Sequence, residues 1–313
     1  MNRLLAALML LGVGTVAPQQ QALTADDGAS VVVQSQVDAR TLDLTISSPA
    51  LGTSAPVRLL LPAHWYDQPD RTWPVLYLLH GCCEVADYQS WTRFTDVERF
   101  TADKDVLVVM PSDGQAGMYS KWAKSVPDWE SFHLTELLQI LRKGYRAGGP
   151  MAVAGLSIGG YGAMAYAFRH PGMFTAAASF SGIPDTTLPA VPEFIQSVLA
   201  RVGYGPWDLW GNEFLNYQTW AEHNPSAHVD KLRGTALFVS CGNGFPGPLD
   251  PPTGADLIEP VAQVSSQAFV AALRLGGVPV TTDFYGGGTH SWPYWERELH
   301  KAWPMLAAGL RLG

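Results

Sequence analysis

The chain has 313 residues, of which 47% are hydrophobic and 15% are charged, and its formal net charge is −8. This length and composition indicate a globular protein with a sizeable buried core. They argue against a nucleic-acid-binding protein, because such proteins need clustered basic side chains to displace phosphate counterions.

The N-terminal segment has the pattern of a secretory signal peptide. Arg3 precedes an uncharged apolar run over residues 4–16, which is too short to span a bilayer as a mature helix. The signal peptide is predicted to cover residues 1–25, and small residues offer alternative cleavage sites at Ala17, Ala22 and Ala25. No second apolar run approaches spanning length, so we expect an exported protein, secreted or held in the cell envelope.

The chain has three cysteines, Cys82, Cys83 and Cys241. Because this number is odd, at least one thiol lacks an intramolecular partner, and the chain is not a disulfide scaffold. Their spacing matches no zinc motif, and we expect neither a metal nor an organic cofactor. A disulfide between the adjacent Cys82 and Cys83 needs a strained peptide geometry, so two thiols are the favoured interpretation.

Short runs rich in Val, Leu and Ile alternate with segments of helical periodicity. The expected strands are 31–36, 42–47, 57–61, 75–79, 106–110, 151–155, 176–181 and 236–240, and the expected helices are 134–145, 158–169, 194–202, 257–275 and 294–310. The later strands are continuous apolar runs, which is typical of parallel strands buried on both faces. The first strands are separated by short turns, which indicates an antiparallel start. We predict an α/β fold with helices on both faces of the sheet, in one domain over residues 26–313.

The stretch 182–234 is much longer than a crossover between two strands requires. Segments of this length are usually functional lids or caps, so we predict a helical cap insertion here. Its apolar residues either line a binding site or pack the insertion onto the domain, and packing is the favoured interpretation for most of them: Phe194, Ile195, Leu199, Trp207, Leu209, Trp210, Phe214 and Trp220.

The sequence GLSIGG, residues 155–160, carries the clearest chemical signal. A Gly-x-Ser-x-Gly motif between an apolar strand and a helix is the nucleophile elbow of serine hydrolases. Side chains two residues before and after Ser157 would clash with neighbouring backbone, which explains the glycines. The turn exposes the hydroxyl of Ser157 at the start of a helix, where a developing oxyanion is stabilised.

A serine hydroxyl needs a base that accepts its proton, and an acid that orients the base. In proteins with this elbow the chain order is Ser, then Asp or Glu, then His. His290 lies in a glycine-rich loop before the last expected helix and is the candidate base. The loop after strand 236–240 offers Asp250, Asp256 and Glu259 as the acid, and spacing does not choose among them. Asp256 also suits a helix cap.

Several short motifs resemble the antigen 85 family, which comprises secreted mycolyltransferases and diacylglycerol acyltransferases with an α/β-hydrolase fold. They are GLSIGG, YSKW (119–122), DLWG (208–211), HNPS (223–226), CGNG (241–244) and GTHSWPYW (288–295), and the similarity covers roughly residues 56 to 300. The resemblance implies Ser157 as nucleophile and His290 as base, and an ungapped match back from His290 implies Glu259 as acid. It also implies the backbone N–H groups of Ile158 and Cys82 as oxyanion-hole donors.

The resemblance further implies an acyl ester or lipid as donor and an alcohol or sugar as acceptor. We expect Trp292, His80 and Trp210 to contact the substrate, with Trp292 as a wall beside the base. The family's Asp-Gly-Leu-Arg is His-Gly-Cys-Cys at residues 80–83, and Lys121 replaces an aspartate. These departures remove the acidic and basic side chains associated with the family's sugar pocket, so trehalose is not implied as acceptor.

The sequence therefore predicts a secreted serine acyltransferase or esterase that forms an acyl-enzyme. One alternative is a carboxylesterase that uses water as the acceptor. A second alternative, from a different class, is a secreted adhesin built on a hydrolase scaffold.

Overall fold

The computed structural model describes residues 23–124, 126–251, 254 and 256–312. The strands are β1 (Ser30–Gln36), β2 (Thr41–Ser48), β3 (Thr53–Leu60), β4 (Trp73–Leu79), β5 (Leu107–Pro111), β6 (Ala147–Leu156), β7 (Ala176–Phe180), β8 (Ala236–Cys241) and β9 (Thr281–Phe284). The helical segments are η1 (Asp87–Gln89), α1 (Ser90–Phe94), α2 (Val97–Phe100), α3 (Trp129–Ser131), η2 (Phe132–Leu137), α4 (Leu138–Gly144), α5 (Ile158–Arg169), α6 (Val191–Arg201), α7 (Tyr217–Glu222), η3 (Pro225–Leu232), α8 (Glu259–Leu275) and α9 (Trp292–Leu310).

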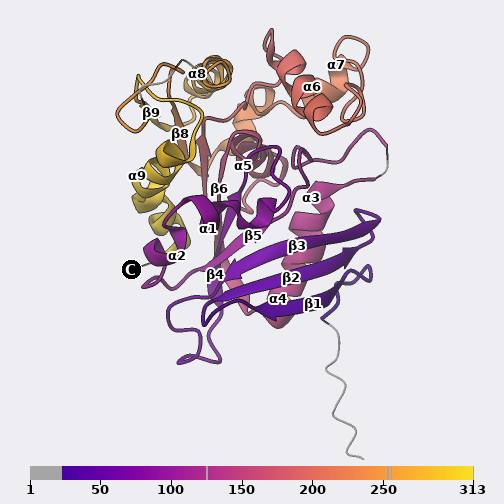
Figure 1. The fold of residues 1–313 in the computed structure, drawn as a ribbon, viewed down its shortest axis with the longest axis vertical. Helices are drawn as coiled ribbons and strands as arrows, with labels where there is room; N and C mark the ends of the chain where they lie inside the picture. Colours follow the sequence, from indigo (N-terminus) through magenta and orange to yellow (C-terminus); the bar gives the residue numbers. More distant parts are fainter. Residues whose placement is uncertain (1–22, 125, 252–253, 255, 313) are drawn as a thin grey trace, which may run out of the picture.

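The described strands form a single sheet in the order β1-β2-β3-β5-β4-β6-β7-β8-β9 (Figure 1). β1, β2 and β3 pair antiparallel, and β3 pairs antiparallel with β5. The strands from β5 to β9 in the sheet run parallel. The predicted antiparallel start is thus confirmed. β9 was not predicted, because its sequence TTDF is exposed or only partly buried and contains no apolar run.

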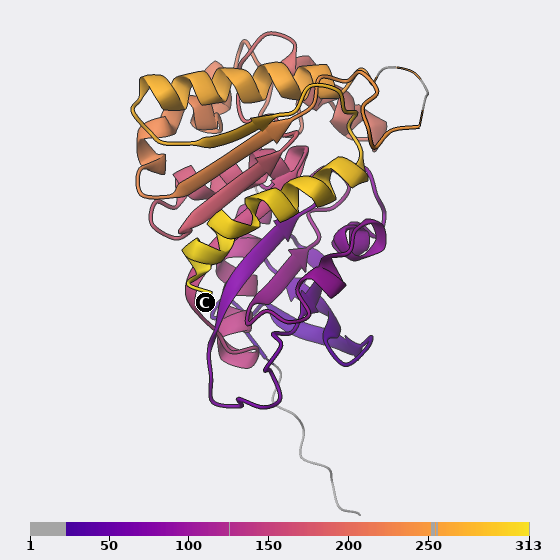
Figure 2. The same cartoon turned by 90° about the vertical axis from the view of Figure 1, so that its left-hand side faces the viewer.

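Both faces of the sheet are covered, which explains the continuous apolar runs in its parallel strands. In β4, Leu76 and Leu78 pack in an apolar cluster with α1, α2 and α9, whereas Val75 and Tyr77 pack in the opposite cluster with α4, α5 and α8. This alternation follows from the period-2 geometry of a strand. Figure 2 shows α9 lying along one face of the sheet. The prediction of an α/β fold with helices on both faces is confirmed.

The insertion between β7 and β8 contains α6, α7 and η3 (Figure 1). Five of its apolar residues are almost completely buried and pack it onto the domain: Ile195, Leu199, Leu209, Trp210 and Trp220. Trp207 and Phe214 instead point to solvent, with exposed fractions of 59% and 79%. Packing is therefore the main contribution of this apolar set.

The predicted signal peptide lies almost entirely outside the described residues. Its last three positions pack against the domain: Leu23 contacts the core, Thr24 bridges to Ser30 and Ala25 is buried. Within the described ranges, no helix combines the length and apolar character needed to cross a membrane.

The chain reverses its direction of travel across the sheet at β4. It passes from β4 to β5 on one side and then returns to β6 on the other side. The loops that follow β4 and β6 therefore diverge at the carboxyl edge of the sheet, which is where ligands bind in open α/β sheets.

Candidate active site

Ser157 lies in a sharp turn between the end of β6 and the start of α5. Its backbone has φ 54° and ψ −123°, a strained conformation for a residue with a side chain. A Cβ on Gly155 would lie 2.2 Å from the carbonyl oxygen of Gly159, and a Cβ on Gly159 would lie 2.4 Å from that of His80. Only glycine fits at either position, so the chain contains the predicted strand–elbow–helix arrangement.

His290 and Glu259 form a direct pair at the same edge of the sheet. Nδ1 of His290 lies 2.7 Å from Oε2 of Glu259. Glu259 begins α8 and is completely buried, whereas His290 lies in the loop between β9 and α9. Because Nδ1 is engaged by the carboxylate, Nε2 is the ring nitrogen of His290 that remains available for proton transfer.

The second carboxylate oxygen of Glu259 is held by a group of hydrogen-bond donors. Oε1 accepts from the hydroxyl of Ser181 at 2.8 Å and from the N–H of Gly242 at 2.6 Å, and Sγ of Cys241 lies 3.2 Å away. Burial alone would raise the pKa of Glu259, but the hydrogen bond to His290, the charge of that imidazole and these donors lower it below its ordinary value. Glu259 is therefore held as a carboxylate behind the imidazole.

The other two candidate acids position the loop that carries His290. Asp256 accepts the backbone N–H of His290 at 2.6 Å and also accepts the N–H of Ile258, as a residue before a helix does. Asp250 accepts from Tyr294 at 2.8 Å and from the hydroxyl of Thr289. Neither aspartate has a hydrogen bond to the imidazole ring of His290 among the described residues.

One group of His, Cys, Asp and Glu in the described ranges has the spacing of metal ligands. It consists of Asp256, Glu259 and His290, whose candidate ligand atoms lie within 4.8 Å of one another. Glu259 already uses both oxygens in hydrogen bonds and Asp256 accepts backbone N–H groups. The group is explained by these hydrogen bonds without an ion.

Ser157 and His290 line the same cavity, which has a volume of about 420 Å³. This size is within the range of small-molecule sites. Its apolar wall is formed by Leu156, Phe194, Val198, Leu257, Trp292 and Trp295, and its charged rim includes Glu84 and Arg201. Phe194 and Val198 come from α6, so the insertion contributes one side of the cavity.

The loop after β4 approaches Ser157 closely enough to form part of the same site. A Cβ on Gly81 would lie 3.3 Å from Cβ of Ser157. Cys82 lines the cavity and Ile158 directly follows Ser157 in the chain, and the backbone N–H of neither residue has a hydrogen-bond acceptor within the described part of the chain. Two free N–H groups therefore lie beside the serine.

Cys82 and Cys83 are joined by a disulfide, whereas the sequence favoured two thiols. The backbone explains the difference, because Cys83 adopts a positive φ of 83° that a sequence does not reveal. The N–H of Cys83 donates to the carbonyl of Gln115 at 2.7 Å, which anchors this conformation. Cys241 is a free, buried cysteine.

The structure separates the three residues that were expected to contact substrate. Trp292 lines the cavity and packs against Trp295. Trp210 is 1% exposed and stacks on His223 in the core, so burial removes it from the substrate-contacting set. His80 is 2% exposed and likewise does not line the cavity.

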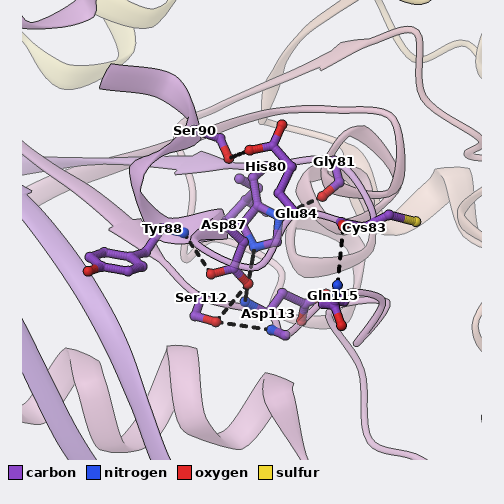
Figure 3. A network of polar contacts seen from close by, with 12 residues as sticks. His80, Gly81, Cys83, Glu84, Asp87, Tyr88, Ser90, Ser112, Asp113 and Gln115 are labelled. Atoms are coloured by element: carbon purple, nitrogen blue, oxygen red, sulfur yellow. Dashed lines mark hydrogen bonds and ion pairs between the residues drawn. The ribbon is translucent and has the colours of Figure 1, made fainter. Parts of the chain in front are cut away.

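His80 instead belongs to a buried polar network beneath the loop after β4 (Figure 3). Its Nδ1 lies 2.7 Å from the carbonyl oxygen of Gly81, and its Nε2 lies 3.2 Å from Oδ2 of Asp87. Sequence reasoning missed both Asp87 and Ser181 as functional candidates. Ser181 could have been found as a polar residue directly after an apolar strand. The sequence around Asp87 contains no comparable signal.

Comparisons with known proteins agree with this geometry. The family model described as "Putative esterase" matches residues 48–306. The diacylglycerol acyltransferase/mycolyltransferase Ag85B of Mycobacterium intracellulare is 32% identical over 252 residues, which cover 76% of each chain. The chain belongs to the antigen 85 family. The Ag85A member from Mycobacterium ulcerans is 32% identical over 248 residues, covering 74% of this chain and 73% of its own.

A solved member of the antigen 85 family has the same fold. The crystal structure of MPT51 (FbpC1) from Mycobacterium tuberculosis covers 87% of this chain and 100% of its own, with a TM-score of 0.76 and 26% identity. The expected α/β-hydrolase fold is confirmed. Membership of this family makes the chain an enzyme that acts as an acyltransferase or a carboxylic ester hydrolase.

Proposed function

We propose that the protein is a serine acyltransferase or esterase that works through an acyl-enzyme on Ser157. The observation that carries this proposal is the 2.7 Å contact of His290 with the buried Glu259, at a cavity that Ser157 also lines. This is the nucleophile, base and acid constellation of serine hydrolases, in their chain order.

In the first half of the reaction, Nε2 of His290 takes the proton of the Ser157 hydroxyl as Oγ attacks the ester carbonyl. The negative charge that develops on the carbonyl oxygen is stabilised by the N–H groups of Ile158 and Cys82 and by the N-terminus of α5. Glu259 stabilises the imidazolium. The imidazolium then donates its proton to the departing alcohol, which leaves the acyl group on Oγ.

In the second half, an acceptor hydroxyl gives its proton to His290 and attacks the acyl-enzyme, and the imidazolium returns a proton to Ser157. The apolar wall formed by Phe194, Val198 and Trp292 suits an acyl chain. The acceptor is an alcohol, such as a glyceride or sugar hydroxyl, by analogy with the relatives named diacylglycerol acyltransferase/mycolyltransferase. Hydrolysis uses water in the same position.

The pattern of residues 1–25 supports export of the mature protein to the cell envelope or the medium. An adhesin on an inactive scaffold is the less favoured function, because the contact of His290 with Glu259, the cavity that Ser157 lines and the two N–H groups without an acceptor among the described residues all support catalysis.

Labelling with a fluorophosphonate probe tests the nucleophile. We expect one equivalent of probe on the wild-type chain and none on Ser157→Ala. Ser181→Ala is a matched control, since Ser181 also follows a strand at this edge but donates to Glu259 rather than lining the cavity. Its probe label should remain on Ser157, and a label on any other residue of the wild type would contradict the proposal.

A partition assay separates transfer from hydrolysis. A chromogenic acyl ester is supplied with or without a monoacylglycerol, a diacylglycerol or trehalose, and the fate of the acyl group is measured. Acyl transfer to an added alcohol supports the acyltransferase. Formation of free acid alone, whichever alcohol is present, would identify a carboxylesterase.

A further inference from the structure

Three successive carbonyl groups, from the last residue of β4 into the loop that follows it, are held by side chains. The carbonyl of Leu79 accepts from Nε1 of Trp91 at 3.2 Å, and that of His80 accepts from the hydroxyl of Tyr119 at 2.9 Å. The carbonyl of Gly81 lies 2.7 Å from Nδ1 of His80 itself. Such extensive anchoring of a short loop indicates that the orientation of its peptide groups matters.

We infer that His80 is a positioning residue of the oxyanion hole: its Nδ1–H holds the carbonyl of Gly81 and thereby aims the N–H of Cys82 into the cavity. The inference rests on the proposed function, since it assigns that N–H to the oxyanion. It gives His80 a role other than substrate contact, which its 2% exposure does not allow.

The geometry of one peptide group links the carbonyl of Gly81 to the N–H of Cys82. The carbonyl of Gly81 and the N–H of Cys82 belong to the same planar peptide, and this peptide is trans. In a trans peptide the C=O and N–H bonds point in opposite directions. A hydrogen bond that fixes the carbonyl on the buried side therefore fixes the N–H on the opposite side, beside Ser157.

The protonation of the ring supports the same assignment. A carbonyl oxygen only accepts hydrogen bonds, so the contact with Gly81 places a proton on Nδ1 of His80. Nε2 lies 3.0 Å from the N–H of Asp113 and 3.2 Å from the carboxylate of Asp87. Burial alone would lower the pKa of His80, but the carboxylate of Asp87 raises it above the ordinary value. The neutral ring and the imidazolium both keep the Nδ1 proton.

Asp87 in turn is fixed by its own hydrogen bonds (Figure 3). Its Oδ1 accepts the N–H of Tyr88 at 2.7 Å, and its Oδ2 accepts the hydroxyl of Ser112 at 2.7 Å. The carboxylate is 2% exposed. A chain of contacts thus runs from the loop after β5 through Asp87, at the start of η1, and His80 to the peptide that faces the serine.

Two substitutions at position 80 separate positioning from simple structural support. The side-chain nitrogen of asparagine falls near the place of Nδ1, whereas that of glutamine falls near the place of Nε2. His80→Asn therefore retains a donor to Gly81, and His80→Gln retains only the contact with Asp87. Both variants lose the ring and disturb the same buried space.

Steady-state kinetics, normalised to active sites titrated with the fluorophosphonate, provide the first readout. An oxyanion-hole donor is worth ~10²–10³ in kcat, so we expect His80→Gln to lose at least about tenfold in kcat with little change in KM. His80→Asn should recover most of this loss. His133→Gln is the control for disturbing a buried histidine, since His133 bonds to Tyr166 and Ser112 rather than to the loop. Equal kcat values in the two His80 variants would overturn the inference.

A second readout does not depend on turnover. The Gly81–Cys82 peptide is the only Gly-Cys step in the chain, so protein labelled with carbonyl-¹³C glycine and ¹⁵N cysteine gives one peptide peak in a carbonyl–amide NMR correlation. We expect the peak to stay single and sharp in His80→Asn and to broaden or split in His80→Gln. A sharp, unshifted peak in His80→Gln would overturn the inference. A wild-type chain without activity would instead overturn the proposed function, because the peptide readout still reports on His80.

Discussion

Two histidine–carboxylate pairs flank the candidate nucleophile, and they differ in what the imidazole faces. His290 lies 2.7 Å from Glu259, with 10% of its side chain exposed at the cavity. His80 lies 3.2 Å from Asp87, and both side chains of this pair are 2% exposed. The same two chemical groups therefore occur once at the cavity wall and once beneath it.

The two pairs differ in the ring nitrogen that does not face the carboxylate, which is Nε2 in His290 and Nδ1 in His80. In His290 it has no hydrogen-bond partner among the described residues, as the proposed proton exchange with serine and substrate requires. In His80 the Nδ1 proton is committed to the carbonyl of Gly81. We therefore propose that an imidazole beside a buried carboxylate carries a proton where one ring nitrogen is free, as in His290, and positions a peptide where both are occupied, as in His80.

We expect the largest loss of kcat from a substitution in the pair at the cavity, His290 and Glu259. Glu259→Gln keeps the shape of the acid but removes its charge, so the imidazolium loses its stabilisation and the ring its fixed tautomer. We expect kcat to fall about 10³–10⁴-fold, as for the acid of other serine triads. Asp256→Asn is the matched control, because Asp256 accepts backbone N–H groups, including that of His290, and has no hydrogen bond to the imidazole ring among the described residues. A greater loss in Asp256→Asn would assign the acid to Asp256.

We expect a smaller loss of kcat from a substitution in the buried pair, His80 and Asp87. Asp87→Asn leaves the contact of His80 with Gly81 in place but removes the charge behind the ring, so we expect kcat to fall roughly 3- to 10-fold, a fraction of the value of one oxyanion donor. Asp105→Asn provides a control, since Asp105 also pairs with a histidine, His64, at 2.7 Å but closer to the surface. If Asp87→Asn lost as much activity as Glu259→Gln, the division of roles between the two pairs would be wrong.

The two pairs should also differ in the sign of their pH dependence of stability. The pKa of Glu259 is lowered, since the bonds and charge of His290 outweigh its burial, so its stabilisation is present above its ordinary pKa of about 4.5 and is lost as the pH falls. The pKa of His80 is raised, since the charge of Asp87 outweighs its burial, so its stabilisation is present below about 6.5 and is lost as the pH rises.

Urea denaturation at several pH values measures both effects. The stability advantage of the wild type over Glu259→Gln should shrink below pH 4.5, and its advantage over His80→Gln should shrink above pH 6.5. Two advantages that change with pH in the same direction would show that one of the pairs has been assigned the wrong charge.

The sequence predicted those structural features that are determined by residues adjacent in the chain. The turn at Ser157 follows from two glycines between an apolar strand and a helix, and the buried parallel strands follow from continuous apolar runs. β9 was missed because its four residues carry no such run. The short helix α7 was missed for a similar reason, since only Trp220 within it is buried.

Features that depend on contacts between residues far apart in the sequence were harder to predict from the sequence. The choice of Glu259 over Asp250 and Asp256 required the family resemblance, because all three acids lie in the same region and spacing does not distinguish them. The burial of His80 depends on Asp87 and on the loop after β5, which the chain brings together only in three dimensions. The disulfide of Cys82 and Cys83 depends on a positive φ that is anchored by Gln115.

Intact-mass spectrometry of the enzyme, quenched shortly after mixing with a chromogenic acyl ester, shows whether an acyl-enzyme forms on Ser157. We expect the wild type to gain the mass of one acyl group, peptide mapping to place this group on Ser157, and Ser157→Ala to gain none. Glu259→Gln should gain the same group more slowly and on the same residue. An acyl group on any other residue, or turnover by Ser157→Ala at the wild-type rate, would contradict the account.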